Sequence, residues 1–125
     1  FGHSFCPLVE MESLKQANVK NIPHGFAVAY DCVLTSIISR NRQKLNFYQY
    51  NKIMKLYNSF DFGFSNKIYA DHNLLWSSFL EMTKHRGNFQ NLPIPIEIGK
   101  YEFLQDVTFK ELVDANKEII ELHSK

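Results

Sequence analysis

Hydrophobic residues recur every three to four positions along three internal stretches of the chain, which is the spacing of one face of an α-helix. The stretches run from Gly25 to about Arg40, from about Tyr48 to Phe60, and from Asp71 onwards. The short Asp71 side chain suits the N-cap of the third helix. The apolar positions are Phe26, Tyr30, Val33, Leu34 and Ile37, then Tyr50, Ile53, Met54 and Tyr57, and then Leu75, Trp76, Phe79 and Leu80. This pattern predicts three amphipathic helices.

Two further helices are predicted at the ends of the chain. Residues 2–16 carry Phe5, Leu8, Val9 and Glu12 at helical spacing. The last helix opens on Thr108 and Glu111, which have the spacing of a capping box. Its expected apolar face consists of Phe109, Leu112, Val113, Asn116 and Ile120.

The periodicity changes to alternation in the segment Leu92-Pro93-Ile94-Pro95-Ile96. Alternation is typical of a strand, but proline has no N–H to donate to a neighbouring strand. We therefore expect an edge strand that pairs with residues 101–104 in a small hairpin. The fold class expected for residues 1–125 is mainly α, a single helical domain with this hairpin.

Composition narrows the functional classes. The chain has 125 residues, 45% of them hydrophobic, and a net charge of +1. A charge this small does not supply the basic surface that nucleic-acid binding requires. The sequence has neither a signal peptide nor an apolar run of the roughly 20 residues that cross a bilayer. We expect a cytoplasmic protein that binds neither nucleic acid nor membranes.

The chain begins on Phe1 rather than on methionine, so we expect it to be part of a longer protein. Cys6 and Cys32 form no CxxC motif, and each is interpreted as a small apolar residue in a reducing compartment.

Two of the five histidines, His3 and His24, lie beside glycine at the starts of predicted helices. Neutral imidazoles on rigid elements are typical zinc ligands, and a catalytic zinc site uses three protein ligands with one position open. Spacing alone does not decide between this interpretation and a simpler one, in which both histidines cap helices or fill polar pockets.

The segments around these histidines resemble the paired signatures of the dehydroquinate synthase superfamily of sugar-phosphate cyclases. Phe1-Gly2-His3-Ser4-Phe5 is similar to the family's N-[FL]-G-H-[TS]-F-G-H, and His24-Gly25-Phe26-Ala27-Val28 is similar to H-G-E-A-V-A. The segments 80–87, 96–99 and 106–108 also resemble family segments in the same order. The resemblance therefore covers nearly the whole chain and implies the C-terminal helical domain of such an enzyme.

The resemblance implies that His3 and His24 bind a divalent metal, zinc or cobalt, together with a glutamate from a segment that precedes this sequence. It also implies an N-terminal NAD-binding domain absent from this chain. In the family, bound NAD transiently oxidises a hydroxyl of a sugar phosphate, phosphate leaves, hydride returns and the ring closes. The metal acts as a Lewis acid on the substrate oxygens, and the cofactor supplies the redox chemistry.

Two departures from the family pattern indicate a subgroup. Pro7 stands where the first motif has its second histidine, and Phe26 stands where the second motif has glutamate. Proline cannot transfer a proton, so chemistry assigned to that histidine in dehydroquinate formation is lost. Pro7, Asp31 after the second motif, and the segments His85-Arg86-Gly87 and Leu92-Pro93-Ile94-Pro95 together resemble cyclases of sedoheptulose 7-phosphate, namely the 2-epi-5-epi-valiolone and desmethyl-4-deoxygadusol synthases. A 3-dehydroquinate synthase and an aminocyclitol-type cyclase remain alternatives.

Three cationic side chains, Lys84, His85 and Arg86, end the third helix. They could bind the phosphate of the substrate, and the resemblance implies a substrate-contacting lysine near here; we assign Lys84 and His85 catalytic roles and Arg86 a substrate contact. Cations at the C-terminus of a helix are also favoured by its dipole without any function. Asp31 is a further candidate substrate contact, although a polar residue on a helix face is more often structural.

Together these features predict the C-terminal part of an NAD- and metal-dependent lyase that converts sedoheptulose 7-phosphate to a cyclitol with loss of phosphate. We expect this part alone to be inactive and the complete protein to be a homodimer. Two readings from other classes stay open. One is a nonenzymatic helical interaction module; the other is a small metal-dependent hydrolase, although no HD or HExxH motif is present.

Overall fold

The computed structural model describes residues 4–5, 11, 22–62, 64, 67–85, 87 and 89–123. In chain order its elements are α2 (His24–Asn41), α3 (Phe47–Asn58), the 3₁₀ helix η1 (Lys67–Ala70), α4 (His72–His85), β1 (Leu92–Glu97), β2 (Lys100–Leu104) and α5 (Phe109–His123). The mainly α fold with one hairpin is therefore confirmed. No helix among the described residues is both long and apolar enough to cross a membrane.

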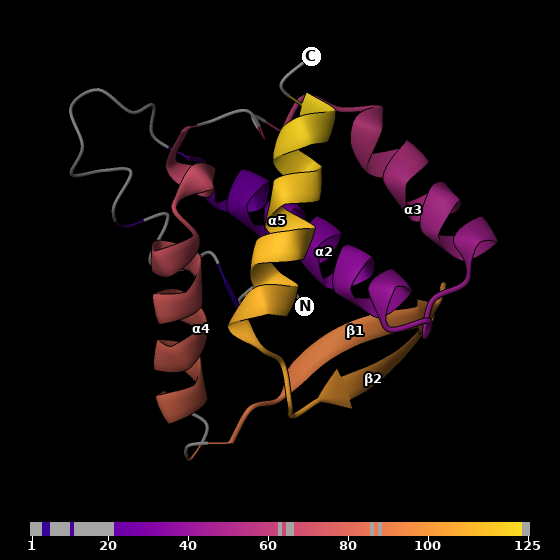
Figure 1. Cartoon of the computed structure of the whole chain (residues 1–125). Helices are drawn as coiled ribbons and strands as arrows, with labels where there is room; N and C mark the ends of the chain where they lie inside the picture. Colours follow the sequence, from indigo (N-terminus) through magenta and orange to yellow (C-terminus); the bar gives the residue numbers. More distant parts are fainter. Residues whose placement is uncertain are drawn as a thin grey trace.

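Helix α2 is the centre of the fold. It crosses behind α5, with α3 and α4 on opposite sides and the hairpin at its C-terminal end (Figure 1). The apolar face predicted for this helix is buried. Side chains on most of its other sides are buried as well, including those of Thr35, Ser36 and Ser39. Thr35 Oγ1 and Ser36 Oγ donate hydrogen bonds to the carbonyl oxygen of Cys32 at 3.0 and 2.8 Å, which satisfies these hydroxyls inside the core.

A buried polar contact joins α2 to α5 and η1. Tyr30 stacks on Tyr69 with ring centroids 3.7 Å apart, and its hydroxyl donates a hydrogen bond to Asn116 Oδ1. Asn116 Nδ2 in turn donates to the carbonyl oxygen of Tyr69 at 2.7 Å. A buried amide needs such partners, so this contact fixes α5 against α2 at one rotation.

The structure corrects the predicted faces of α4 and α5. Leu75 and Phe79 are buried, but Leu80 is 42% exposed, because α4 contacts the core along a narrow side. In α5, Phe109 is 39% exposed. The buried side of α5 consists of Leu112, Ala115, Asn116 and Ile119. Ala115 and Ile119 thus take the places that the sequence assigned to Val113 and Ile120, which are only partly buried. Helix η1 was not predicted.

The hairpin has the predicted pairing. β1 and β2 are antiparallel, with Leu92 opposite Leu104 and Pro95 opposite Tyr101. The turn contains Gly99 at φ +87°, a left-handed conformation that glycine adopts without strain. Ser39 Oγ donates a hydrogen bond to the carbonyl oxygen of Pro95 at 2.5 Å, which attaches the hairpin to α2.

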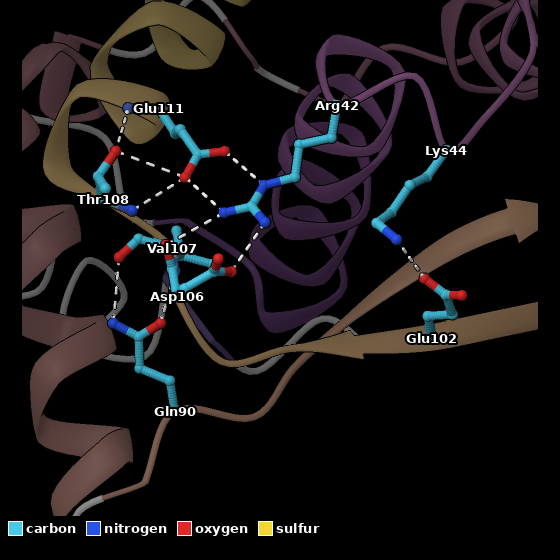
Figure 2. Close-up of polar contacts among 8 residues, drawn as sticks. All are labelled: Arg42, Lys44, Gln90, Glu102, Asp106, Val107, Thr108 and Glu111. Atoms are coloured by element: carbon cyan, nitrogen blue, oxygen red, sulfur yellow. Dashed lines mark hydrogen bonds and ion pairs between the residues drawn. The ribbon is translucent and has the colours of Figure 1, made fainter.

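The C-terminal end of α2 is closed by ion pairs to the start of α5 (Figure 2). Arg42 Nε and Nη2 donate to the two carboxylate oxygens of Glu111 at 2.6 and 2.8 Å, and Nη1 donates to Asp106 Oδ1 at 2.8 Å. The predicted capping box is present, because Thr108 N donates to Glu111 Oε1 at 3.0 Å and Glu111 N donates to Thr108 Oγ1 at 3.2 Å. The Arg42 hydrogen bonds hold the pKa of Glu111 below its usual value.

Candidate functional site

The N-terminal end of α2 presents His24. Pro23 precedes it with φ −58° and ψ 144°, and the Pro23 side chain makes no capping hydrogen bond to the helix. The carbonyl oxygen of Pro23 instead accepts hydrogen bonds from Phe26 N and Ala27 N at 3.0 and 3.2 Å. His24 is exposed. Its imidazole therefore lies at the surface, on the first residue of a helix.

Asp31 lies two turns further along α2 and is fully buried. Its Oδ2 accepts a hydrogen bond from Ser4 N at 3.2 Å, and its Oδ1 accepts one from Phe5 N at 2.8 Å. Phe5 is also buried and stacks on Phe79 of α4 with ring centroids 4.9 Å apart. Residues 4 and 5 are thus held by their backbone to α2 and by a side chain to α4.

The sequence alone did not predict this role of Asp31. The signal was a charged residue within an otherwise apolar helix, at Tyr30-Asp31-Cys32. A buried carboxylate requires hydrogen-bond donors, but the sequence does not show which donors the fold brings to it.

Lys84 and His85 lie at the C-terminal end of α4, with side chains 70% and 69% exposed. Their nearest described charge is Glu81, at 3.8 Å from Lys84 Nζ and 3.9 Å from His85 Nε2. Exposed pairs of this kind contribute little to stability. This end of α4 lies well away from the start of α2 (Figure 1), so the structure does not bring Lys84 and His85 next to His24.

His3, Pro7 and Arg86 lie outside the described residues, as does most of the helix predicted over residues 2–16. Within the described part of the chain, no group of three or more histidine, cysteine, aspartate or glutamate residues could hold a metal ion. His24 is the one predicted metal ligand in that part. Its surface position fits a zinc site completed by other segments, because imidazole is a favoured zinc ligand.

A separate hollow of about 530 Å³ lies between α2, α3 and the hairpin. Cys32, Tyr57 and Tyr101 are among the residues that line it, and none of the predicted site residues does. Burial raises the pKa of the Cys32 thiol. The thiol therefore stays protonated at neutral pH, which makes it a poor nucleophile and agrees with the interpretation of Cys32 as a small apolar residue.

No protein-family model matches the chain. The chain is 33% identical over 115 residues to the 2-epi-5-epi-valiolone synthase of Streptomyces albus, an alignment that covers 92% of this chain and 27% of the relative. It is 31% identical over 122 residues to the enzyme of the same name from an Actinomyces species, covering 98% of this chain and 30% of the relative.

The fold is similar to that of ValA, the 2-epi-5-epi-valiolone synthase from Streptomyces hygroscopicus subsp. jinggangensis, in a structure with NAD⁺ and Zn²⁺ bound. The TM-score is 0.77 at 29% identity, and the match covers 98% of this chain and 32% of ValA. The chain thus spans about 30% of the length of the relatives it matches. The predicted resemblance to the C-terminal part of sugar-phosphate cyclases is confirmed.

Proposed function

We propose that this chain is the C-terminal part of an NAD- and zinc-dependent cyclase that converts sedoheptulose 7-phosphate to a cyclitol with loss of phosphate. The observation that carries the proposal is the similarity to 2-epi-5-epi-valiolone synthases along 92% to 98% of this chain. The chain matches only 32% of ValA, which binds NAD⁺ and Zn²⁺. A further N-terminal domain would therefore hold the NAD, and this part alone would be inactive.

Within this chain, His24 and His3 would supply two imidazole ligands to the zinc, and the preceding domain would supply a carboxylate. Zinc in such a site polarises hydroxyl and carbonyl oxygens as a Lewis acid. The exposed position of His24 at the start of α2 supports this assignment, because the third ligand must approach from outside the chain.

Lys84, His85 and Arg86 would meet the anionic substrate. Charge-assisted hydrogen bonds to phosphate are strong, and Lys84 and His85 are exposed at the end of a helix where nothing described neutralises them fully. A substrate that binds these side chains would therefore displace water from them and would not have to break a buried ion pair. The homodimeric state of the complete protein remains a prediction.

The substrate is tested in the complete polypeptide that contains this chain, supplied with NAD⁺ and Zn²⁺. We expect release of inorganic phosphate from sedoheptulose 7-phosphate and no turnover of the dehydroquinate precursor, because Pro7 replaces a proton-transfer group. Turnover of only the dehydroquinate precursor would contradict the substrate assignment. Release from neither would contradict the proposed activity.

The metal assignment is tested with His24→Ala in the same polypeptide. Loss of a ligand should lower the zinc affinity more than about 100-fold, since even residues that only orient ligands are worth 10- to 100-fold. His123→Ala is the control, because it removes an imidazole at the end of α5 that is not a predicted ligand. Equal zinc content in His24→Ala and the wild type, measured by elemental analysis, would remove His24 from the site.

A further inference from the structure

The side-chain amide of Asn116 is fully buried and meets residues from three other parts of the fold. Its Oδ1 accepts a hydrogen bond from the hydroxyl of Tyr30 on α2. Its Nδ2 donates to the carbonyl oxygen of Tyr69 on η1 at 2.7 Å and lies 2.9 Å from Nδ1 of His72, the first residue of α4. An amide NH₂ group has two hydrogens, so one is directed to Tyr69 and the other to His72.

The orientation of this amide determines the protonation of His72. The carbonyl oxygen of Tyr69 can only accept a hydrogen bond, so it must face the amide nitrogen of Asn116 and not the amide oxygen. The same nitrogen then faces Nδ1 of His72, which must accept. A ring nitrogen accepts only when it carries no proton. The contact therefore requires a neutral His72 with its proton on Nε2.

Protonation of His72 is incompatible with this contact. His72 is only partly buried, so protons can reach the ring. A charged imidazole carries N–H groups on both nitrogens and offers no acceptor to Asn116. Rotating the amide by half a turn does not repair the contact, because the amide oxygen would then face the carbonyl oxygen of Tyr69. One buried hydrogen of Asn116 would thus lose its partner, which is unfavourable inside a protein.

The surroundings of His72 favour the neutral ring. Burial lowers the pKa of His72 and the positive charge of Lys117 on α5 lowers it further, whereas Asp71 acts in the opposite direction. The positive end of the α4 dipole also disfavours a cation at this position. Because the pKa is lowered in the folded state, the stabilisation is present above the ordinary value of 6.5 and is lost as the pH falls through the lowered value.

We propose that His72 is a pH-sensitive switch: its neutral ring holds the amide of Asn116 in the orientation that joins α5 to α2, η1 and the start of α4, and its protonation releases this contact. Helix α5 packs against both η1 and α4, so the release should loosen these elements from one another while the apolar core keeps the fold. The inference does not depend on the proposed activity.

The test measures amide hydrogen exchange by mass spectrometry in the complete polypeptide at several pH values between 8 and 4.5, with rates corrected for the intrinsic effect of pH on exchange. In the wild type, protection of peptides that cover residues 67–75 and α5 should fall about fivefold at low pH, the equivalent of one hydrogen bond. Protection that does not change with pH in the wild type would overturn the proposal.

Two variants isolate the role of His72. In His72→Gln the side-chain oxygen can accept from Asn116 and does not titrate, so protection of these peptides should no longer fall with pH beyond what other groups cause. His85→Gln is the matched control, because it removes an exposed imidazole at the other end of α4 and should keep the wild-type pH dependence. Equal pH dependence in His72→Gln and the wild type would show that another group controls the contact.

Exchange of the imidazole C2 hydrogen, followed in the wild-type protein, gives the titration of His72 without any substitution. We expect the midpoint for His72 to lie below the ordinary value of 6.5 and to coincide with the loss of amide protection. A midpoint at or above 6.5, or a loss of protection at a clearly different pH, would contradict the proposed switch.

Discussion

The two ends of α2 differ in what closes them. At the C-terminal end, Arg42 pairs with Glu111 and Asp106, and all three belong to this chain (Figure 2). At the N-terminal end the N-cap residue Pro23 makes no side-chain capping hydrogen bond, and His24 is exposed. The contacts at the C-terminal end are made by residues of this chain alone. The metal site proposed at the N-terminal end would need a further ligand from the preceding domain.

The residues at the C-terminal end of α2 stabilise the fold, whereas His24 at the N-terminal end is proposed to bind the zinc. Ion pairs that are partly shielded from water stabilise a structure only when every partner is in place. A zinc site that must admit substrate keeps one position open. A helix that is fixed at one end can therefore present an exposed ligand at the other without losing its orientation.

The largest expected effect on stability comes from Arg42→Ala, which leaves Glu111 and the start of α5 without their partner. We expect the free energy of unfolding to fall by about 2 kcal/mol, measured by urea denaturation, with no change in zinc content. Lys44→Ala is the control. It removes an exposed pair with Glu102, at 2.9 Å, and should cost less than about 1 kcal/mol. Equal losses in the two variants would show that the Arg42 contacts do not close this end of the helix.

A smaller effect is expected from Lys84→Ala at the end of α4. If Lys84 Nζ meets the phosphate of the substrate, the KM of the complete polypeptide should rise about tenfold, the equivalent of one charge-assisted hydrogen bond, with unchanged stability and zinc content. Lys110→Ala removes a similarly exposed lysine at the start of α5 and should leave the KM unchanged. An unchanged KM in Lys84→Ala would show that Lys84 does not contact the substrate, and would leave the N-terminal end of α2 as the only part of the proposed site in this chain.

The smallest effect concerns pH. The pKa of Glu111 is lowered in the folded state by Arg42, so its contribution to stability is present above the ordinary value of 4.5 and is lost as the pH falls through the lowered value. The wild type should therefore exceed Glu111→Gln in stability at pH 7, and this difference should shrink below pH 4.5, as urea denaturation at several pH values would show. A difference that stays constant down to pH 3 would contradict the pairing.

The sequence predicted the elements better than their contacts. Helix α2, the Asp71 cap and the capping box at Thr108 all depend on neighbouring residues, and each was confirmed: Asp71 Oδ1, for example, accepts from Leu74 N at 3.0 Å. The rotation of α5 was not predictable, because it depends on the contact of Asn116 with Tyr30, 86 residues away. Asp31 was predicted as a substrate contact or a structural polar residue, but its partners could not be predicted because they lie 26 and 27 residues away.

The candidate site was predictable from the sequence only through resemblance. His24 has no described geometry that distinguishes it from another exposed histidine, and its proposed role depends on a ligand that this chain does not contain. Arg42, in contrast, shows its role through its own contacts.

The difference between the two ends is tested most directly by titrating zinc, in competition with a coloured chelator, into the complete polypeptide and into the isolated 125-residue chain. Circular dichroism first establishes that the isolated chain is helical. We expect one tightly bound zinc ion in the complete polypeptide and an affinity about 100-fold lower or weaker still in the isolated chain, because two imidazoles alone do not complete the coordination. Tight binding of one zinc ion by the isolated chain would contradict the claim that its N-terminal end is incomplete.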